Sequence, residues 1–432
     1  MAKKTKTTRR DRRQDSPLCA VDIGSSGIRA MAATENPDGT LHILGMESVS
    51  KYGPVERGII IQKTEVGMML RRLVLLLSNR IGTREPVDSV FLTVGGKLLQ
   101  QKEVSVKRDL ISKNYIADKL LQAMQNESRD KIEDRYSTMA VLSTEPIKYL
   151  LDGIEQTEVP SKNQKARFIE VLYNVFVGKI ESRDNTRGSF DRANISIEQQ
   201  WVRPDALLAA LADNSDMDKG CAIIDFGAQT TTMSVYKDDR FVYTRVIPVG
   251  GYDINANIQT QGVSFDIAEK LKQNFGYAAE EFVEQNRLLE VRSAVAEGQK
   301  VRIKTSTLAQ LIQMKLFEAV NPLMQDLKQY ESGIGKVYIT GGACKLQGLQ
   351  EYLQAMTTLP VEYGSHAAWL EETAPDDYYY PENTSLVGTL ALAAEYRKDF
   401  PDEDPDHIPP YIKFWKKLED STLVLFTDDN NK

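Results

Sequence analysis

One pattern of apolar and polar positions occurs twice, once in each half of the chain. A short apolar strand ends at Asp22 and Gly24, small polar residues follow, and a second β-rich run begins. The same order returns around Asp225 and Gly227. Short apolar and β-branched runs separated by glycine are typical of hairpins. The sequence therefore predicts two β-hairpins whose tips carry the same kinds of residue.

The two predicted tips have the chemistry of a phosphate-binding site. Glycine lets the backbone turn closely and present its N–H groups to phosphate oxygens, and hydroxyl and guanidinium groups can donate to the same oxygens. The residues concerned are Gly24, Ser25, Ser26 and Arg29 at the first tip and Gly227, Ala228, Gln229 and Thr230 at the second. A single turn of this kind is usually an ordinary hairpin, but two can clamp one polyphosphate from opposite sides.

Asp22 and Asp225 need a separate explanation, because carboxylates repel phosphate. Mg²⁺ gives up its water reluctantly and commonly uses one or two carboxylates together with phosphate oxygens. We therefore expect both aspartates to contact Mg²⁺ through water. The three cysteines and three histidines are scattered, which gives no support to a zinc site or a Ser-His-Asp triad.

A third glycine turn adds to the predicted site. An apolar run over 337–340 ends at Gly341 and Gly342, and a helical pattern follows over 348–353. A glycine pair at the end of a strand allows a flat ligand to approach the backbone closely. Taken alone, this segment would be a plain turn between a strand and a helix.

Length and composition are those of a soluble globular protein. The 432 residues suffice for roughly two to four domains, and 41% apolar with 27% charged residues is ordinary for this class. The net charge of -7 argues against nucleic acid as the main partner.

Both ends of the chain differ in composition from the middle. Residues 1–17 are rich in lysine and arginine and lack the apolar run of a secretory signal. We expect a disordered basic tail there, with a weak contact to anionic lipid as the alternative. Residues 398–410 combine acidic residues with proline, which is typical of an extended linker.

The segment 411–426 has the pattern of an amphipathic helix. Aromatic and aliphatic residues fall along one stripe with lysines beside it, as in helices that lie at a membrane surface. The residues expected to contact the membrane are Tyr411, Ile412, Phe414, Trp415, Lys416, Lys417 and Leu418. The same pattern also fits an element docked on the protein's own core, and by itself it does not separate the two.

The two Asp-Gly turns and the segment 340–343 resemble the phosphate and adenosine loops of the actin, Hsp70 and sugar-kinase superfamily. Within that superfamily the chain resembles the FtsA family over nearly all of 18–397. The strings that carry the resemblance are VFLTVGGK at 90–97, RVIPVGG at 245–251, AEKLKQNFG at 268–276 and ITGGACKLQGL at 339–349. The small-residue helix at 385–393 resembles the second connecting helix of these proteins.

The resemblance implies an α/β, actin-like two-lobed fold made of duplicated ribonuclease-H-like domains with an inserted subdomain of the FtsA type. The implied divisions are 18–85 with 171–215 (subdomain 1A), 86–170 (the insert, 1C), 216–250 with 331–397 (2A) and 251–330 (2B). ATP and Mg²⁺ are the implied ligands. Glu269 and Lys272 would face the ribose and base, and the adenosine loop would contain Gly341, Gly342, Ala343 and Lys345.

The resemblance also implies a division protein that polymerises and anchors FtsZ filaments to the cytoplasmic side of the inner membrane. It would be peripheral, lie at the division site and recruit other divisome proteins. Its implied partners are the FtsZ C-terminal tail, further copies of itself and an anionic membrane surface. Lys315 and Glu318 match the family's FtsZ-binding helix, and a basic residue suits the acidic tail, although both residues also fit a solvated helix face.

Ala228 and Gln229 depart from the family, which usually has glycine at these places in the second loop. Neither adopts positive φ as freely as glycine, so we expect fewer backbone contacts to phosphate and at most slow ATP hydrolysis. Two other interpretations stay open, a small-molecule kinase of the same superfamily and an adaptor of the related pilus-assembly type. A chaperone has less support, because no substrate-binding domain follows the adenosine motif.

Overall fold

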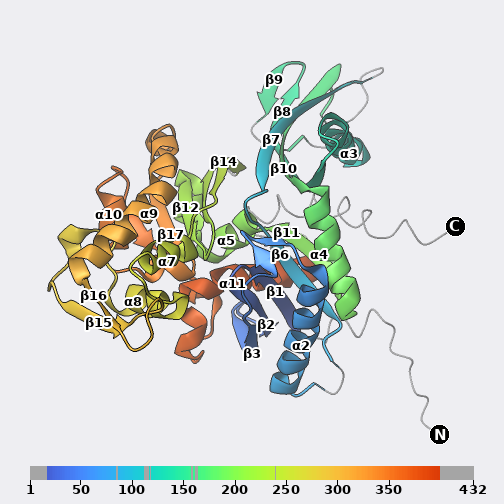
Figure 1. Cartoon of the computed structure of the whole chain (residues 1–432). Helices are drawn as coiled ribbons and strands as arrows, with labels where there is room; N and C mark the ends of the chain where they lie inside the picture. Colours follow the sequence, from blue (N-terminus) through green and yellow to red (C-terminus); the bar gives the residue numbers. More distant parts are fainter. Residues whose placement is uncertain are drawn as a thin grey trace, which may run out of the picture.

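The computed structural model describes residues 17–398, apart from 84–85, 111–115, 117, 157–158, 161–163 and 239. Figure 1 shows two lobes side by side and a small sheet above the first of them. The predicted basic tail, acidic linker and amphipathic segment lie, but for residues 17 and 398, outside the described residues. Within the described part, the chain forms no helix that is long and apolar enough to cross a membrane.

The first lobe is built on a five-stranded sheet in the order β11-β6-β1-β2-β3. Its strands are β1 (Leu18–Gly24), β2 (Gly27–Glu35), β3 (Leu41–Val49), β6 (Ser89–Val94) and β11 (Ser196–Val202). The covering helices are α2 (Lys63–Ile81) and α4 (Ile180–Ala193) on one face and α5 (Arg203–Leu211) and α11 (Thr384–Lys398) on the other. Side chains alternate along β1, so Leu18 packs with α11 whereas Cys19 packs with α2.

The second lobe repeats this plan with a five-stranded sheet in the order β14-β13-β12-β17-β18. Its strands are β12 (Cys221–Phe226), β13 (Thr231–Lys237), β14 (Arg240–Ile247), β17 (Lys336–Thr340) and β18 (Val361–Tyr363). In both lobes the strand that carries the aspartate pairs antiparallel with the next strand and parallel with a later one. The two predicted hairpins are therefore present, on equivalent strands.

Five α-helices and one hairpin surround the second sheet in the described part of the chain. The helices are α6 (Asn214–Lys219), α7 (Gly251–Gln259), α8 (Phe265–Phe275), α9 (Thr305–Leu327) and α10 (Leu349–Gln354). The hairpin consists of β15 (Leu288–Arg292) and β16 (Lys300–Lys304). Apolar residues of α7, α8, α9 and α10 share one buried cluster with β12, β13 and β17.

The small sheet is antiparallel, in the order β7-β10-β8-β9, and α3 packs against it. Its elements are β7 (Gln100–Asp109), α3 (Asp118–Arg135), β8 (Met139–Leu151), β9 (Ile154–Gln156) and β10 (Phe168–Lys179). The predicted insert at 86–170 contains most of these elements. Strand β6 falls inside that range but pairs with β1 and β11, and β10 continues beyond it. The finer division into subdomains stays a prediction.

The chain passes between the lobes after β11, through α5 and then α6, and again at α11, which follows the second lobe but packs on the first sheet. Helices α5 and α11 meet backbone to backbone. A Cβ added at Gly388 would lie 1.7 Å from the carbonyl oxygen of Ala206. The hydroxyl of Thr389 also forms a hydrogen bond with that of Thr93 on β6. The small residues at 385–393 are all buried, as close packing beneath the cleft requires.

We predict that Gly388→Ala lowers the free energy of unfolding by about 3 kcal/mol, because the new methyl group forces α5 and α11 apart. The matched control is Gly188→Ala in α4, where an added Cβ would meet only the Cδ of Lys63 at 3.5 Å. That change should raise stability by about 0.5–1 kcal/mol through helix propensity alone. Urea denaturation of the two variants measures the difference, and equal effects would contradict the close crossing of the helices.

Candidate functional site

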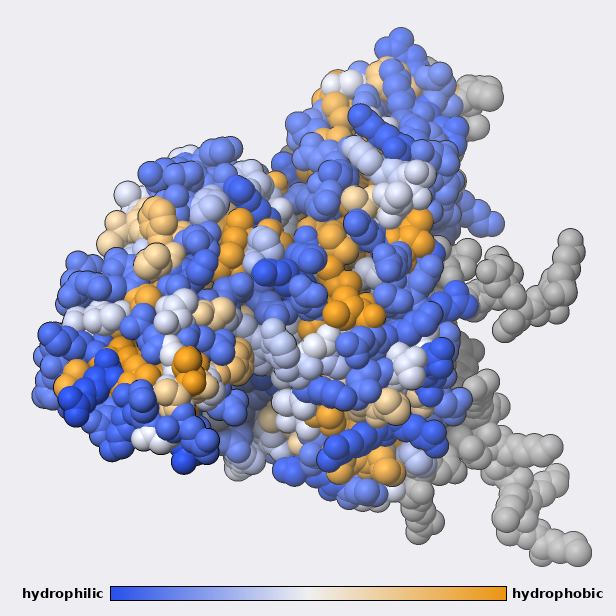
Figure 2. All heavy atoms as spheres, in the orientation of Figure 1, coloured by the Kyte–Doolittle hydropathy of each residue, from blue (hydrophilic) through white to orange (hydrophobic). Residues whose placement is uncertain are grey.

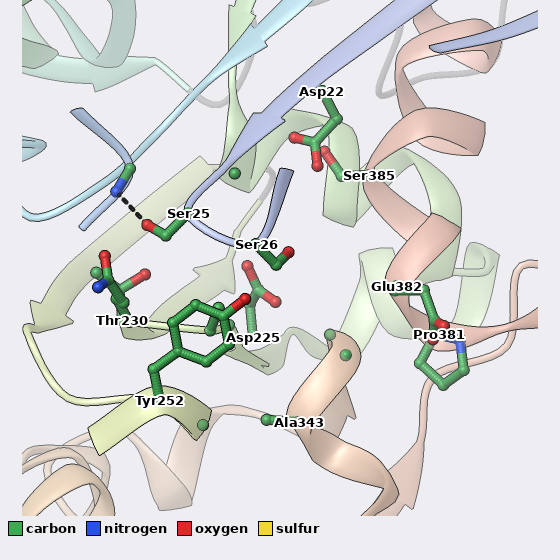
Figure 3. A pocket seen from close by; sticks show the side chains of 18 of the residues that line it. Asp22, Ser25, Ser26, Asp225, Thr230, Tyr252, Ala343, Pro381, Glu382 and Ser385 are labelled. Carbon is green, nitrogen blue, oxygen red and sulfur yellow. Dashed lines mark hydrogen bonds between the residues drawn. The ribbon is translucent and has the colours of Figure 1, made fainter. Parts of the chain in front are cut away.

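A cavity of about 720 Å³ lies between the two lobes, where the turns after β1, β12 and β17 face one another (Figure 3). This volume is typical of small-molecule and cofactor sites. All the residues that the sequence predicted for nucleotide binding line the cavity. They are Asp22, Gly24, Ser25, Ser26, Arg29, Asp225, Gly227, Ala228, Gln229, Thr230, Glu269, Lys272, Gly341, Gly342, Ala343 and Lys345. The fold thus brings together segments that are far apart in the sequence.

The first turn is the tip of the β1–β2 hairpin, where Gly24 pairs with Gly27 and leaves Ser25 and Ser26 as the two connecting residues. The Oγ atom of Ser25 accepts a hydrogen bond from the backbone N–H of Gly58 at 3.0 Å, drawn as the dashed line in Figure 3. Gly58 belongs to a short hairpin formed by β4 (Val55–Glu56) and β5 (Ile59–Ile60). This second hairpin therefore holds the first turn in place through that hydrogen bond.

The second turn joins β12 to β13. Neither Ala228 nor Gln229 has a positive φ, so the backbone of this turn does not require glycine at either place. The carbonyl group of Ala228 accepts a hydrogen bond from the N–H of Tyr252 at 2.6 Å, and that of Gly227 accepts one from Gly251 at 3.0 Å. The turn is therefore anchored on the first residues of α7.

A set of contacts with Arg57 joins the lobes at the mouth of the cavity. The backbone N–H of Arg57, on the β4–β5 hairpin, donates to the Oε1 atom of Gln229 at 2.7 Å. The guanidinium of Arg57 lies 3.5 Å from the Oδ1 atom of Asp253 on α7. We call Arg57, Gln229 and Asp253 the interlobe latch. Gln229, which departs from the family pattern, has a clear structural role in it.

The third turn follows β17 and requires glycine at its first position. Gly341 has a φ of +89°, and an added Cβ would lie 2.3 Å from the Oδ1 atom of Asp225. The strand end is therefore packed directly against the aspartate of the neighbouring strand. Beyond the turn, the Nζ atom of Lys345 forms an ion pair with the Oε2 atom of Glu382 at 2.7 Å.

Glu269 and Lys272, on α8, form an ion pair with 2.9 Å between the Oε2 and Nζ atoms. The Nζ atom of Lys272 also donates to the carbonyl oxygen of Gly251 at 3.0 Å. Burial lowers the pKa of Lys272, and the nearby Glu269 opposes this shift. Burial by itself would raise the pKa of Glu269, but the attraction of Lys272 and a hydrogen bond from Asn255 bring it below its usual value. The two side chains thus hold each other in place on the wall of the cavity.

No local pattern pointed to Arg203, the first residue of α5, which forms ion pairs with both predicted metal-binding aspartates. Its guanidinium donates a hydrogen bond to Asp22, and its Nη1 atom lies 3.9 Å from the Oδ2 atom of Asp225. Burial alone would lower the pKa of Arg203, but Asp22 and Asp225 raise it. Burial raises the pKa of Asp225, and Arg203 opposes that rise. The dipeptide Arg-Pro marks a helix start, but nothing local links it to two distant aspartates.

The aspartates as arranged do not fit a Mg²⁺ site. Both carboxylates face Arg203, which supplies a cation between them. In the described part of the chain, no three His, Cys, Asp or Glu side chains come together in a way that could hold a metal ion. The notion that Asp22 and Asp225 contact Mg²⁺ through water stays a prediction.

Aromatic side chains that the sequence did not single out lie at one end of the cavity. The rings of Tyr252 and Phe265 both line it and meet edge to face, with 4.9 Å between their centroids. Tyr52, from the first lobe, lies 5.9 Å from Tyr252 by the same measure. The three residues come from separate segments, so no local pattern could predict their contact. A flat ligand that enters the cavity meets apolar surface here.

Lys315 and Glu318 lie away from the cavity, on α9 of the second lobe. They form an ion pair with each other, with 2.8 Å between the Nζ and Oε2 atoms. Next to them Met314 and Phe317 are 62% and 50% exposed, which is unusual for large apolar side chains. Hydrophilic residues predominate over the face seen in Figure 2, and apolar ones lie in separate patches.

Comparison with known proteins finds similarity to one family of cell-division proteins. The family model for "Cell division protein FtsA" matches residues 222–388. FtsA of Bacillus subtilis (strain 168) is 23% identical over 346 residues, covering 78% of this chain and 75% of the relative. FtsA of Enterococcus faecalis is 25% identical, covering 77% and 75%, and FtsA of Rhizobium meliloti is 24% identical, covering 80% of both.

Solved structures show the same fold at low sequence identity. A PilM–PilN type IV pilus biogenesis complex aligns with a TM-score of 0.64 and 15% identity, covering 87% of this chain and 98% of that one. MreB5 of Spiroplasma citri bound to ADP aligns with a TM-score of 0.53 and 12% identity, covering 90% and 100%. The predicted actin-like fold is confirmed, and so is the predicted resemblance of the chain to the FtsA family of cell-division proteins.

Proposed function

We propose that this chain binds ATP between its lobes, polymerises, and anchors FtsZ filaments to the cytoplasmic face of the inner membrane at the division site. The observation that carries the nucleotide part is the meeting of three glycine turns, from β1, β12 and β17, on one cavity of about 720 Å³. Such turns present backbone N–H groups to anions, and cavities of this size suit a nucleotide. Nucleotide binding in general also follows from membership of the actin-like ATPases.

The residues around the cavity suggest how ATP would lie. Ser26 and Thr230 would donate hydroxyl groups to the phosphates from opposite lobes. Arg29 is held by a bond from its Nη1 atom to the carbonyl oxygen of Glu382 at 2.9 Å, which leaves other guanidinium N–H groups for phosphate. The Gly341–Gly342 turn and the Glu269–Lys272 pair would receive the adenosine. Bound ATP would supply charged phosphates that both lobes can contact at once.

The charged groups of the cavity favour a structural role over rapid catalysis. Each carboxylate that lines it faces a basic partner: Asp22 and Asp225 face Arg203, Glu269 faces Lys272, and Glu382 faces Lys345. A general base must lie within reach of the reacting group with an oxygen free to take the proton, and each of these carboxylates is already engaged by a cation. We therefore propose at most slow ATP hydrolysis, which argues against the small-molecule kinase.

Helix α9 is the proposed contact for the FtsZ tail. Lys315 offers a positive charge on a face where Met314 and Phe317 are exposed. An apolar patch with a basic residue suits an acidic peptide that also carries apolar side chains. Self-assembly and recruitment of other divisome proteins are expected of an FtsA-family protein with an actin-like fold.

The proposed membrane contact rests on the sequence of 411–418, which lies outside the described residues. Each lysine near an anionic surface contributes about 1 kcal/mol, and each apolar side chain adds a part of its roughly 1.5–3 kcal/mol of full burial. One such segment binds weakly once the cost of ordering it is included. A filament with many copies gains avidity without any new contact.

A second candidate is an adaptor of the pilus-assembly type. It is favoured by the TM-score of 0.64 to the PilM–PilN complex. Such an adaptor would bind nucleotide and a peptide of a membrane protein, and it would bind neither FtsZ nor lipid by itself. The experiments on α9 and on the C-terminal segment therefore separate the two proposals.

We predict that Ser26→Asp weakens ATP binding at least about tenfold, because the new carboxylate would lie beside the phosphates and repel them. Isothermal titration with ATP measures the affinity. Ser137→Asp, on an exposed turn before β8, makes the same chemical change far from the cavity and should leave the affinity unchanged. If both variants bind ATP as the native protein does, the phosphates are not held at this tip.

Lys315→Glu should weaken binding of a peptide with the FtsZ C-terminal sequence by about tenfold, since attraction to the acidic tail becomes repulsion. Fluorescence anisotropy with a labelled peptide gives the dissociation constants. The control is Lys270→Glu, an equal charge change at an exposed position of α8. An equal loss in both variants would indicate a general effect of net charge, and α9 would then not be the docking site.

Co-sedimentation with anionic liposomes in Mg-ATP tests the membrane proposal. The full chain should pellet, and a chain that ends after His407 should stay in solution, because it lacks the apolar and basic residues of 411–418. A full-length Trp415→Glu variant serves as the milder change and should pellet less. Pelleting of all three would assign the contact to the basic residues of 1–17, and the pilus-type adaptor gains support if none pellets.

A further inference from the structure

Arg203 is placed where two carboxylates from different lobes approach each other. It is the first residue of α5, directly after β11, so the end of a buried strand fixes its backbone. Asp22 comes from β1 of the first lobe and Asp225 from β12 of the second. Figure 3 shows both aspartates among the side chains that line the pocket. One guanidinium therefore faces both lobes at the centre of the cavity wall.

The side chain of Arg203 passes close to the backbone of Gly95. A Cβ added at Gly95, in the turn after β6, would lie 3.2 Å from both the Cβ and the Nε atoms of Arg203. The stem of the arginine thus passes over a glycine that has no side chain to displace it. With 19% of its side chain exposed, Arg203 is a constrained part of the wall.

The charge balance of the cavity depends on Arg203. Besides it, three basic and four acidic side chains line the cavity, so its removal would leave a net negative lining facing an anionic ligand. In many nucleotide sites a divalent metal ion corrects such an excess by bridging carboxylates and phosphate oxygens. Here a guanidinium, which keeps its charge at all ordinary pH values, already occupies the space between the two carboxylates.

A hydrated Mg²⁺ and Arg203 would compete for the same position. Mg²⁺ requires an octahedral shell of oxygens at about 2.1 Å and retains several waters, which needs more space than a guanidinium. Arginine offers no acceptor atom to the ion, and the two cations would repel each other in a cleft with little water. The hydrogen bond to Asp22 uses one of the five guanidinium N–H groups, and the others can donate to phosphate oxygens.

We propose that Arg203 is the resident cation of the nucleotide site, neutralising Asp22 and Asp225 so that ATP binds without a divalent metal ion. The inference rests on the proposed ATP-binding function and concerns how that site meets its charge requirement. In this site Arg203 acts as a binding residue for the phosphates and as the bridge between the lobes. Metal-free ATP carries more negative charge than its magnesium complex, and the fixed guanidinium offsets it.

The test measures ATP affinity of the native full chain in 5 mM Mg²⁺ and in excess EDTA by isothermal titration. The two dissociation constants should agree within about threefold. A loss of about tenfold or more in EDTA would overturn the role of Arg203 while leaving ATP binding intact. Absence of ATP binding in both buffers would overturn the proposed nucleotide function itself, and this inference with it.

Variants of Arg203 then test whether this residue is the reason that ATP affinity does not depend on Mg²⁺. Arg203→Gln should bind ATP at least about tenfold more weakly in EDTA and recover much of the loss in Mg²⁺, because the freed carboxylates can then recruit the ion. Arg203→Lys, which keeps the charge, should remain independent of Mg²⁺. Arg72→Gln removes an exposed arginine from α2 and should behave as the native chain. Equal losses for Arg203→Gln in both buffers would reduce Arg203 to an ordinary phosphate contact and contradict the proposal.

Two further measurements distinguish a loss of ATP binding from a folding defect in Arg203→Gln. The double variant Arg203→Gln with Asp225→Asn has the same net charge as the native group of three residues, so it should fold and bind ATP in EDTA. Thermal unfolding with Mg²⁺ alone provides a readout without nucleotide. The ion should raise the Tm of Arg203→Gln and leave that of the native chain unchanged, and a rise for the native chain would overturn the proposal.

Discussion

Two helices carry the chain between the lobes, and the short distance between their backbones determines where the cavity residues lie. Gly388 of α11 rests on the carbonyl group of Ala206 in α5, three residues after Arg203. Because α5 begins at the end of β11, the position of this crossing also fixes the guanidinium between the two aspartate-bearing strands. Leu207 of α5 and Ser385 of α11 form part of the cavity wall itself. A wider crossing would therefore change the site as well as the core.

The electrostatics of the cavity follow from bringing two equivalent strands face to face. Duplication of the lobes places Asp22 and Asp225 at the ends of matching strands, and a buried pair of like charges is costly unless a cation lies between them. Arg203 provides that cation from a third element. The lobes are thus held together partly by a charge that belongs to neither hairpin.

The hairpins and glycine turns were predictable from the sequence, because each depends on a few consecutive residues. Gly341 illustrates this, since its place after an apolar strand already indicates a turn that a side chain would block. Arg203 and the Arg57–Gln229 contact were not predictable in the same way. They join residues that are 181 and 172 positions apart, so their partners depend on the packing of whole lobes.

Two predictions depend on distant partners that a local pattern does not reveal. The insert was placed at 86–170 because the segment 90–97 resembles the start of an FtsA-type insert, whereas β6 pairs with β1 and β11 in the first sheet. The water-mediated Mg²⁺ contact was inferred from the aspartates alone, without the arginine that packing brings to them. In both cases the partners lie far away in the sequence, so the local pattern does not show them.

The interlobe latch bears on how strongly a ligand can control this protein. A ligand shifts an equilibrium between open and closed forms only by the difference in its affinity for them. Arg57, Gln229 and Asp253 already join the lobes through contacts of the protein's own. These contacts hold the lobes together before any nucleotide binds, so less of the ligand's binding free energy is needed to bring the lobes together. Such a chain would keep nearly the same arrangement of its lobes with and without nucleotide.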